Sequence, residues 1–369
     1  MTLLFAAALF SRSFVRLIDT DQGFRMPAVL ATDVQIPWAK YKENAQRGEF
    51  YDRVLARLRS QPGVLSAAFI NAVPLTGETW VDVLSVPGDN RPDFEKPPVN
   101  VRMASPDYFD TMGIPVLSGR TFTDKDKDRK VVMVSERVAH LLWPRQGAIG
   151  RQIVDGGNTY EVIAVVGDVR AEAHKAPVLT VYRTHWSWPG LTMKLVARAA
   201  GDPRSIAGAV RASVRSVDPD VPLAEMRTMR EVLAQSVAQR KLQAVLTLVF
   251  AATALLLAGL GVYGVVAYSV SRRTNEMGIR IALGASARNL CAMVVRQAML
   301  PVVLGVIVGL AAAFAEGRLL ASLLYEVSPR DPVILSAVSV VLLAVGLAAS
   351  LIPAVRAARS APVKALHYE

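Results

Sequence analysis

Three stretches of the chain are apolar and contain no Asp, Glu, Lys or Arg: residues 242–271, 297–315 and 332–355. A helix needs about 20 mostly apolar residues to cross the ~30 Å hydrocarbon core of a bilayer, and these stretches reach or approach that length. Core helices of soluble proteins rarely run so far without a charge. The pattern therefore predicts three complete transmembrane helices, at about residues 244–270, 297–315 and 333–355.

The N-terminus, residues 1–11 (MTLLFAAALFS), is also apolar but is too short to cross a bilayer. It lacks the basic start of a signal peptide, since its first charge is Arg12 on the far side. Two interpretations stand: an unusual signal anchor, or the C-terminal end of a first spanning helix. We favour the second, which makes the N-terminal transmembrane helix a partial one.

Between the apolar N-terminus and residue 242, the hydrophobic positions follow the patterns of short strands and amphipathic helices. Alternating patterns predict strands near residues 28–37, 64–73, 80–86, 99–104, 131–135, 160–166, 178–182 and 192–198. Helical spacing is found at 41–60, 106–112, 136–143 and 203–217. The order lacks regular βαβ alternation, so we expect an α+β domain joined to an α-helical membrane domain.

A helical period also continues through Leu233, Val237, Lys241 and Val245. It predicts one rigid stalk helix, from about residue 230 to 241, that runs on into the first long span. The expected domains are then residues 1–24 (end of a first span and its exit), 25–241 (the α+β domain with its stalk) and 242–369 (the membrane domain).

Charge sets the expected orientation. The chain carries 42 Lys+Arg and 31 Asp+Glu, a net charge of +11. The loop after the first long span holds five arginines and one glutamate, the next loop nets −1, and the C-terminal tail nets +2. The positive-inside rule places the first loop and the C-terminus in the cytoplasm and the large domain outside. Topology explains the basic balance, so no nucleic-acid partner is expected.

Catalytic motifs are absent from the sequence. There is no G-x-x-x-x-G-K-[ST], H-E-x-x-H, C-x-x-C or G-x-S-x-G, and the four histidines have no ligand spacing. Asp124, Asp126 and Asp128 alternate like the start of a calcium loop, but the later Gly and Glu are missing, which favours a solvated charged turn. We expect no enzyme, no catalytic or metal site and no cofactor. Cys291, the single cysteine, excludes an intrachain disulfide.

One segment, residues 271–290 (SRRTNEMGIRIALGASARNL), lies in the predicted cytoplasmic loop. Glu276 and Arg280 are four residues apart and can pair along a helix. Met277 lies on the apolar face of this predicted helix. The glycine and alanine residues have short side chains, so the backbone of another protein can approach closely. The segment is either a basic loop that anchors the spans at the lipid headgroups or a short docking helix. The candidate docking residues are Glu276, Met277, Gly278, Arg280, Ala282 and Gly284.

Glycines recur in the predicted spans, at Gly259, Gly261, Gly264, Gly305 and Gly309. Small residues allow close helix packing in lipid, although glycine is common in spanning helices in any case. Both interpretations remain open.

Several of these segments together resemble the FtsX/MacB-type ABC transporter permeases. RRTNEMGIRIALGAS resembles the family's signature after the second span, and PAVRAARSAPVKALHYE resembles its C-terminal ending. ASPDYFDTMGIPVLSGRTFT, VMVSERVAHLLWP and YEVIAVVGDVR resemble the MacB-like periplasmic core domain. The N-terminal segment is similar to the exit from the first span, particularly in the C-terminal half of the duplicated permeases of acidobacteria.

The resemblance implies a permease subunit in a bacterial inner membrane, which transmits ATP-driven motion from a cytoplasmic ABC ATPase to the extracytoplasmic domain. Efflux or lipoprotein and peptide export would be its task. ATP would be bound by the partner, and the docking residues would form the ATPase-coupling segment. A second permease copy or half, a periplasmic partner and membrane lipid are the other expected partners. The alternative is a non-transport regulator of an extracytoplasmic partner such as a cell-wall hydrolase.

Overall fold

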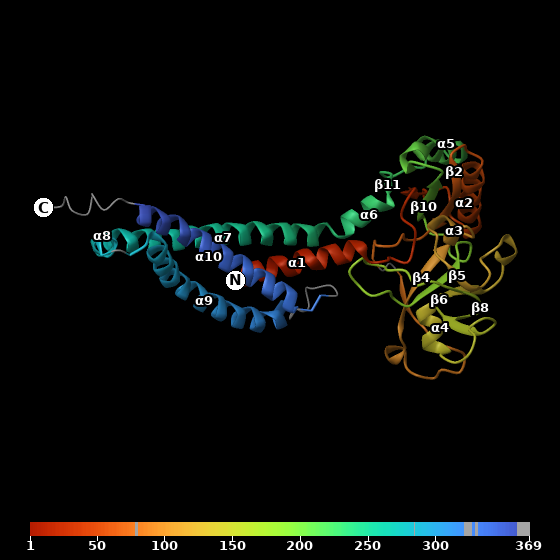
Figure 1. The fold of residues 1–369 in the computed structure, drawn as a ribbon. Coiled ribbons are helices and arrows are strands. Elements are labelled where there is room, and N and C mark those ends of the chain that lie inside the picture. Colours follow the sequence, from red (N-terminus) through yellow and green to blue (C-terminus); the bar gives the residue numbers. More distant parts are fainter. Residues whose placement is uncertain (78–79, 284, 321–326, 329–330, 360–369) are drawn as a thin grey trace. The chain divides into compact units, whose positions relative to one another are not determined.

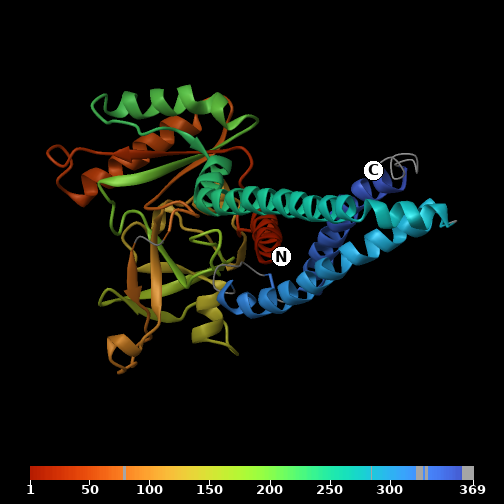
Figure 2. The same ribbon diagram turned by 90° about the vertical axis from the view of Figure 1, so that its left-hand side faces the viewer.

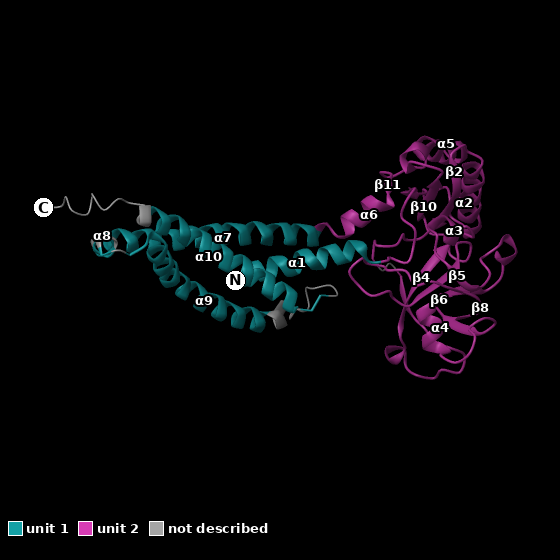
Figure 3. Ribbon diagram, viewed as in Figure 1, with its two compact units in different colours: residues 1–20, 239–369 teal, residues 21–238 magenta. Residues whose placement is uncertain are grey.

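The computed structural model describes residues 1–77, 80–283, 285–320, 327–328 and 331–359. The chain divides into two compact units (Figure 3). Unit 1 comprises Met1–Thr20 and Gln239–Glu369, and unit 2 comprises Asp21–Ala238. The segment that precedes unit 2 in sequence and the one that follows it thus belong to the same helical unit.

Unit 2 is built on one mixed sheet (Figure 1). Its described strands run in the order β11-β1-β10-β2-β4-β9-β6-β8-β5, with β3 paired to β4 and β7 to β8. The β4–β9 and β6–β8 pairs are parallel, and the remaining pairs are antiparallel. The strands are β1 Val29–Gln35, β2 Val64–Ile70, β3 Val81–Val83, β4 Pro98–Ala104, β5 Val116–Gly119, β6 Val131–Ser135, β7 Gln152–Asp155, β8 Asn158–Val166, β9 Thr180–Thr184, β10 Thr192–Ala199 and β11 Arg227–Thr228.

Two helices cover one part of this sheet, α2 (Asn44–Arg59) and α5 (Ala207–Val217), which lie side by side near β2 and β10 (Figure 1). Phe50 of α2 and Val214 of α5 are buried in the same core as Phe69 of β2. The remaining helices of the unit are α3 Tyr108–Met112, α4 Glu136–Leu142 and α6 Met229–Ser236, with 3-10 turns at Asp93–Glu95, Asp124–Asp126 and Pro203–Ile206. The mixed α/β character expected from the sequence is confirmed.

Three short strands were not predicted: β5, β7 and β11. β5 lies at the end of the sheet, and all four of its residues are exposed, so it shows no alternation of buried and exposed positions. Its last residue, Gly119, has φ 86° and packs so closely on β8 that a Cβ would lie 2.1 Å from the Ile163 carbonyl oxygen. Only glycine fits that position.

The predicted single stalk helix is wrong. α6 ends at Ser236, and α7 (Ala238–Arg272) starts after Val237, whose φ of −102° and ψ of 1° leave the helical region. A capping box between Thr228 and Glu231 fixes the start of α6, and Val237 is 4% exposed. We attribute the break to these two constraints. Helical spacing in the sequence shows neither where α6 is capped nor that Val237 is buried.

Unit 1 contains α1 (Thr2–Asp19), α7, α8 (Thr274–Ala282), α9 (Ala287–Leu320) and α10 (Pro332–Arg359). Among the described residues, α7, α9 and α10 are long and apolar enough to cross a membrane, as predicted; α1 does not meet the same criterion. α9 and α10 pack along each other, and α1 contacts both through Phe5 and Leu9. α7 and α9 meet near α8 and diverge away from it (Figures 1 and 2).

The acidic turn of unit 2 differs from the solvated turn that we expected. The Asp126 side chain is inaccessible to solvent, and its carboxylate accepts hydrogen bonds from Arg120 Nη1 and Nη2 (2.6 and 2.8 Å) and from the Thr123 backbone N–H (3.0 Å). The Arg120 hydrogen bonds lower the pKa of Asp126 to about 2. The middle carboxylate therefore closes a loop, while its neighbours Asp124 and Asp128 are exposed.

Candidate functional site

A single residue, Arg273, separates the end of α7 from the start of α8, and its carbonyl oxygen accepts a hydrogen bond from the Met277 N–H at 3.0 Å. Along α8, Arg280 Nη2 donates to Glu276 Oε1 at 2.8 Å, which is the pair that the spacing predicted. Both side chains are about half exposed, so the pair is worth only a few tenths of a kcal/mol to the helix. Its charges remain accessible to a partner.

The adjoining face of α8 is held by Met277, which is 7% exposed. Met277 packs in a cluster with Val266 of α7, Val294 of α9 and Ala354 of α10. Met277 thus places α8 in one buried cluster with residues of all three long helices of the unit. A displacement of α8 would therefore move a side chain that belongs to the cluster shared by these helices.

Two large apolar side chains remain uncovered beside this anchor. Ile279 is 62% exposed and Leu283 is 82% exposed. Next in sequence, Ser286 Oγ accepts a hydrogen bond from the Asn289 N–H (3.3 Å), which caps the start of α9. Of the remaining docking residues, Gly278 and Ala282 lie within α8, and Gly284 lies outside the described residues.

The five candidate packing glycines have different surroundings. A Cβ on Gly259 would lie 3.2 Å from Val345 of α10, and one on Gly309 would lie 2.4 Å from Met1, the residue before α1. Gly261, Gly264 and Gly305 have open space at that position. The structure therefore brings two of the five against a neighbouring part of the chain and leaves the other three without a contact within 4 Å of that position.

Unit 2 holds two polar clusters, one partly buried and one buried, that the sequence did not reveal. Asp52 of α2 binds His185 Nε2 and Trp186 Nε1, each at 2.9 Å. Burial raises the pKa of Asp52, but these hydrogen bonds outweigh it and hold the pKa below its ordinary value. Their partners are far apart in sequence, so no local motif could have pointed to them.

The second cluster pairs buried Asp155 of β7 with buried Arg183 of β9, whose guanidinium stacks over the Tyr160 ring at 4.5 Å. Burial raises the pKa of Asp155 to about 6, and the nearby Asp82 carboxylate acts in the same direction, while Arg183 opposes it. The described residues contain no group of three or more His, Cys, Asp or Glu that could hold a metal ion. The Asp155–Arg183 pair is typical of a structural ion pair between strands, and the Asp52 cluster joins α2 to the segment after β9.

Comparisons with known proteins agree with this architecture. The MacB-like periplasmic core domain family matches residues 20–212, and the FtsX-like permease C-terminal family matches residues 248–362. The uncharacterized ABC transporter permease YvrN of Bacillus subtilis is 29% identical over 285 residues, which cover 71% of this chain and 68% of the relative. The macrolide export ATP-binding/permease protein MacB of Neisseria gonorrhoeae is 26% identical over 282 residues, which cover 70% of this chain and 42% of the relative.

Among solved structures, the periplasmic region of MacB from Actinobacillus actinomycetemcomitans aligns with 57% of this chain and 94% of its own, with a TM-score of 0.39 and 14% identity. The two family matches together span both units in the expected order. Three apolar helices supply the membrane part. The chain belongs to the FtsX/MacB-type ABC transporter permeases, as a membrane protein with an extracytoplasmic domain.

Proposed function

We propose that this chain is the permease subunit that transmits ATP-driven motion from a cytoplasmic ABC ATPase to its extracytoplasmic domain, for efflux or for lipoprotein or peptide export. One observation carries the proposal: α8 has an anchored face and a free face. Met277 ties it to α7, α9 and α10, while Glu276 and Leu283 are exposed. Such a helix can be displaced by a partner bound to its exposed side chains, and Met277 then transmits the displacement to the long helices.

The proposal assigns an orientation in the bacterial inner membrane. α8 and the C-terminus lie in the cytoplasm, because the loop that contains α8 carries the largest positive excess of the connecting segments. α1 lies in the membrane-proximal segment of residues 1–24, and residues 25–241 and 242–369 form the outer and membrane domains. ATP is bound by the partner subunit, and a second permease copy or half completes the assembly.

Labelling with a membrane-impermeant maleimide tests the orientation. A cysteine introduced at Asp128, which is exposed in unit 2, should react in intact spheroplasts. One introduced at Ser286, which is exposed beside α8, should react only after the membrane is opened. The single native cysteine, Cys291, is replaced by serine in both proteins. Reaction at position 286 in sealed spheroplasts would contradict the assignment.

Photo-crosslinking tests the docking face. A photoreactive residue at Ile279 or Leu283 should form a crosslink to an ABC ATPase that mass spectrometry identifies, and the same residue at lipid-accessible Leu257 of α7 should not. Crosslinks only to lipid or to an extracytoplasmic protein would contradict coupling through α8. The latter result would favour the regulator instead.

Charge variants separate docking from helix stability. Glu276→Arg and Arg280→Glu should each weaken ATPase association about tenfold or more, a change of 1.4 kcal/mol or more, because charged contacts at an interface impose complementarity. The double variant restores the pair within α8 with reversed polarity. It should remain defective if the charges face the ATPase, and recover if they only stabilise α8, which would count against the proposal.

A further inference from the structure

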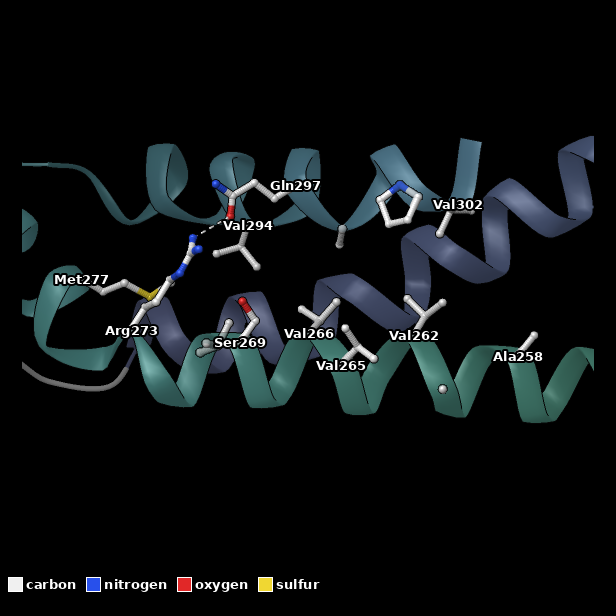
Figure 4. Close-up of a pocket in the computed structure, with 14 residues that line it drawn as sticks. Ala258, Val262, Val265, Val266, Ser269, Arg273, Met277, Val294, Gln297 and Val302 are labelled. Carbon is white, nitrogen blue, oxygen red and sulfur yellow. Dashed lines mark hydrogen bonds between the residues drawn. The ribbon is translucent and has the colours of Figure 1, made fainter. Parts of the chain in front are cut away.

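A cavity of about 460 Å³ lies between α7 and α9 within unit 1 (Figure 4). Most of its lining is apolar, including Val262 and Val265 of α7 and Pro301 and Val302 of α9. Its size and lining are those of a ligand pocket, since such pockets measure about 300–1,000 Å³ and are mainly hydrophobic with a few placed polar groups. The cavity lies between helices that are apolar enough to span a membrane, which makes a membrane-soluble occupant the natural one.

The polar groups gather at one end. Arg273 Nη1 donates to Gln297 Oε1 at 3.2 Å, and Ser269 lies beside them, whereas Ala258 and Val302 lie toward the other end (Figure 4). Pro301 has no N–H, so the Gln297 carbonyl lacks its usual donor four residues on. The end of the cavity near α8 is therefore lined by a cation and by a residue whose backbone carbonyl lacks its helical donor.

The positive charge at this end is not compensated. Arg273 lines the cavity and forms no ion pair with a carboxylate in the part of the chain that the structure describes, whereas Arg280 of α8 is paired with Glu276. Basic pockets between transmembrane helices at the cytoplasmic side are suited to anionic lipid headgroups. An apolar slot with a basic mouth has the complementary charge and shape for such a lipid.

We propose that the cavity binds one anionic phospholipid of the bilayer. Arg273 binds the phosphate, and a headgroup hydroxyl donates a hydrogen bond to the Gln297 backbone carbonyl. One acyl chain lies along Val262, Val265 and Val302. Met277 of α8 lines the same cavity, so the lipid contacts the anchor of the coupling segment. The site goes beyond the proposed function, because lipid binding requires neither the ATPase nor a cargo.

The test is native mass spectrometry of the purified full chain, titrated with phosphatidylglycerol or with phosphatidylcholine of the same acyl chains. Wild type should retain phosphatidylglycerol in preference. Arg273→Gln should lower that preference at least fivefold, the effect of about 1 kcal/mol per basic residue. Arg296→Gln removes the same charge from an exposed position outside the cavity lining and should lower it less than twofold.

A second pair of variants tests the acyl slot without changing charge. Gly261 lines the cavity, and Gly264 does not, yet a side chain at either position meets nothing within 4 Å. Gly261→Leu should reduce phosphatidylglycerol retention at least fivefold by filling the slot, and Gly264→Leu should leave it unchanged.

Three outcomes would overturn the proposal: no preference over phosphatidylcholine in wild type, equal losses in the two arginine variants, or full retention in Gly261→Leu. A shift in oligomer mass with unchanged lipid retention in Gly261→Leu would show that a second copy occupies the cavity, which also refutes the lipid site. The measurement contains no ATPase, so its failure leaves the coupling proposal standing, and failure of the crosslinking tests leaves the lipid site standing.

Discussion

The two units use the same apolar residue types in opposite ways. In unit 2, Phe69 of β2 is fully buried between α2 and the sheet, where it contacts Tyr51 with ring centroids 4.6 Å apart. In unit 1, Leu257 of α7 is 64% exposed. Burial from water stabilises the first unit, whereas lipid is as apolar as leucine and supplies no such gain in the second. The helices of unit 1 must therefore be held by close packing and by a few polar contacts.

The largest expected effect sharpens this contrast. Phe69→Ala should lower the free energy of unfolding of unit 2 by about 3–5 kcal/mol, because it leaves a cavity in the core. Leu257→Ala should leave it unchanged. Urea unfolding of the full chain, followed by tryptophan fluorescence, reports on unit 2 alone, because that unit contains all five tryptophans: Trp38, Trp80, Trp143, Trp186 and Trp188. Equal losses in the two variants would remove the distinction.

The second effect concerns charge inside unit 2. The pKa of Asp126 is about 2 in the folded chain, below the 3.8 of an ordinary aspartate. A lowered pKa contributes stability that is present above about pH 4 and is lost as pH falls toward 2, here about 2 kcal/mol. Asp126→Asn should therefore lose about 2 kcal/mol at pH 7, with a difference from wild type that shrinks below pH 4.

The exposed neighbour Asp124 provides the control for this network. Asp124→Asn should differ from wild type by less than about 0.5 kcal/mol at either pH, as surface substitutions usually do. The same urea and tryptophan measurement applies. A pH-independent loss in Asp126→Asn would mean that packing, not charge, explains the buried carboxylate.

The third effect tests packing in unit 1. Gly259→Leu should destabilise the helices by about 1–3 kcal/mol, since even its Cβ would lie 3.2 Å from Val345. Gly264→Leu meets open space and should cost nothing. The loss of helical circular dichroism during titration with sodium dodecyl sulfate measures both. Equal midpoints would indicate that α7 and α10 do not depend on this contact.

Local patterns predicted the elements whose signals lie within one segment. Uncharged length marked α7, α9 and α10, and four-residue spacing marked the pair between Glu276 and Arg280. The docking role of α8 stays a prediction. Asp155 and Arg183 illustrate what was beyond reach: they meet because β7 and β9 belong to one sheet, and no spacing in the sequence encodes that meeting.

The break at Val237 and the burial of Asp126 have a different cause. Helical periodicity and the alternating acidic run describe the sequence pattern, but neither indicates which side chain is buried or which groups it binds. Val237 is buried at the break, and Asp126 accepts hydrogen bonds from its near neighbours Arg120 and Thr123. The lipid cavity is a similar case, since Gly261 and Gly264 are indistinguishable in the sequence and differ only in what lies across from them.

The smallest effect asks whether polar contacts in unit 1 approach the strength of the Asp126 network. Arg12 of α1 donates to Asp331 just before α10, and Asp331 Oδ1 also accepts from the Val333 N–H at 2.9 Å. The two side chains are 38% and 16% exposed, so the pair should contribute at most about 1 kcal/mol. Arg12→Gln, Asp331→Asn and the double variant form a cycle that isolates this coupling from the cap on α10. A coupling of about 2 kcal/mol or more, measured by the same detergent titration, would place ion pairs alongside packing as a main source of stability in the membrane unit.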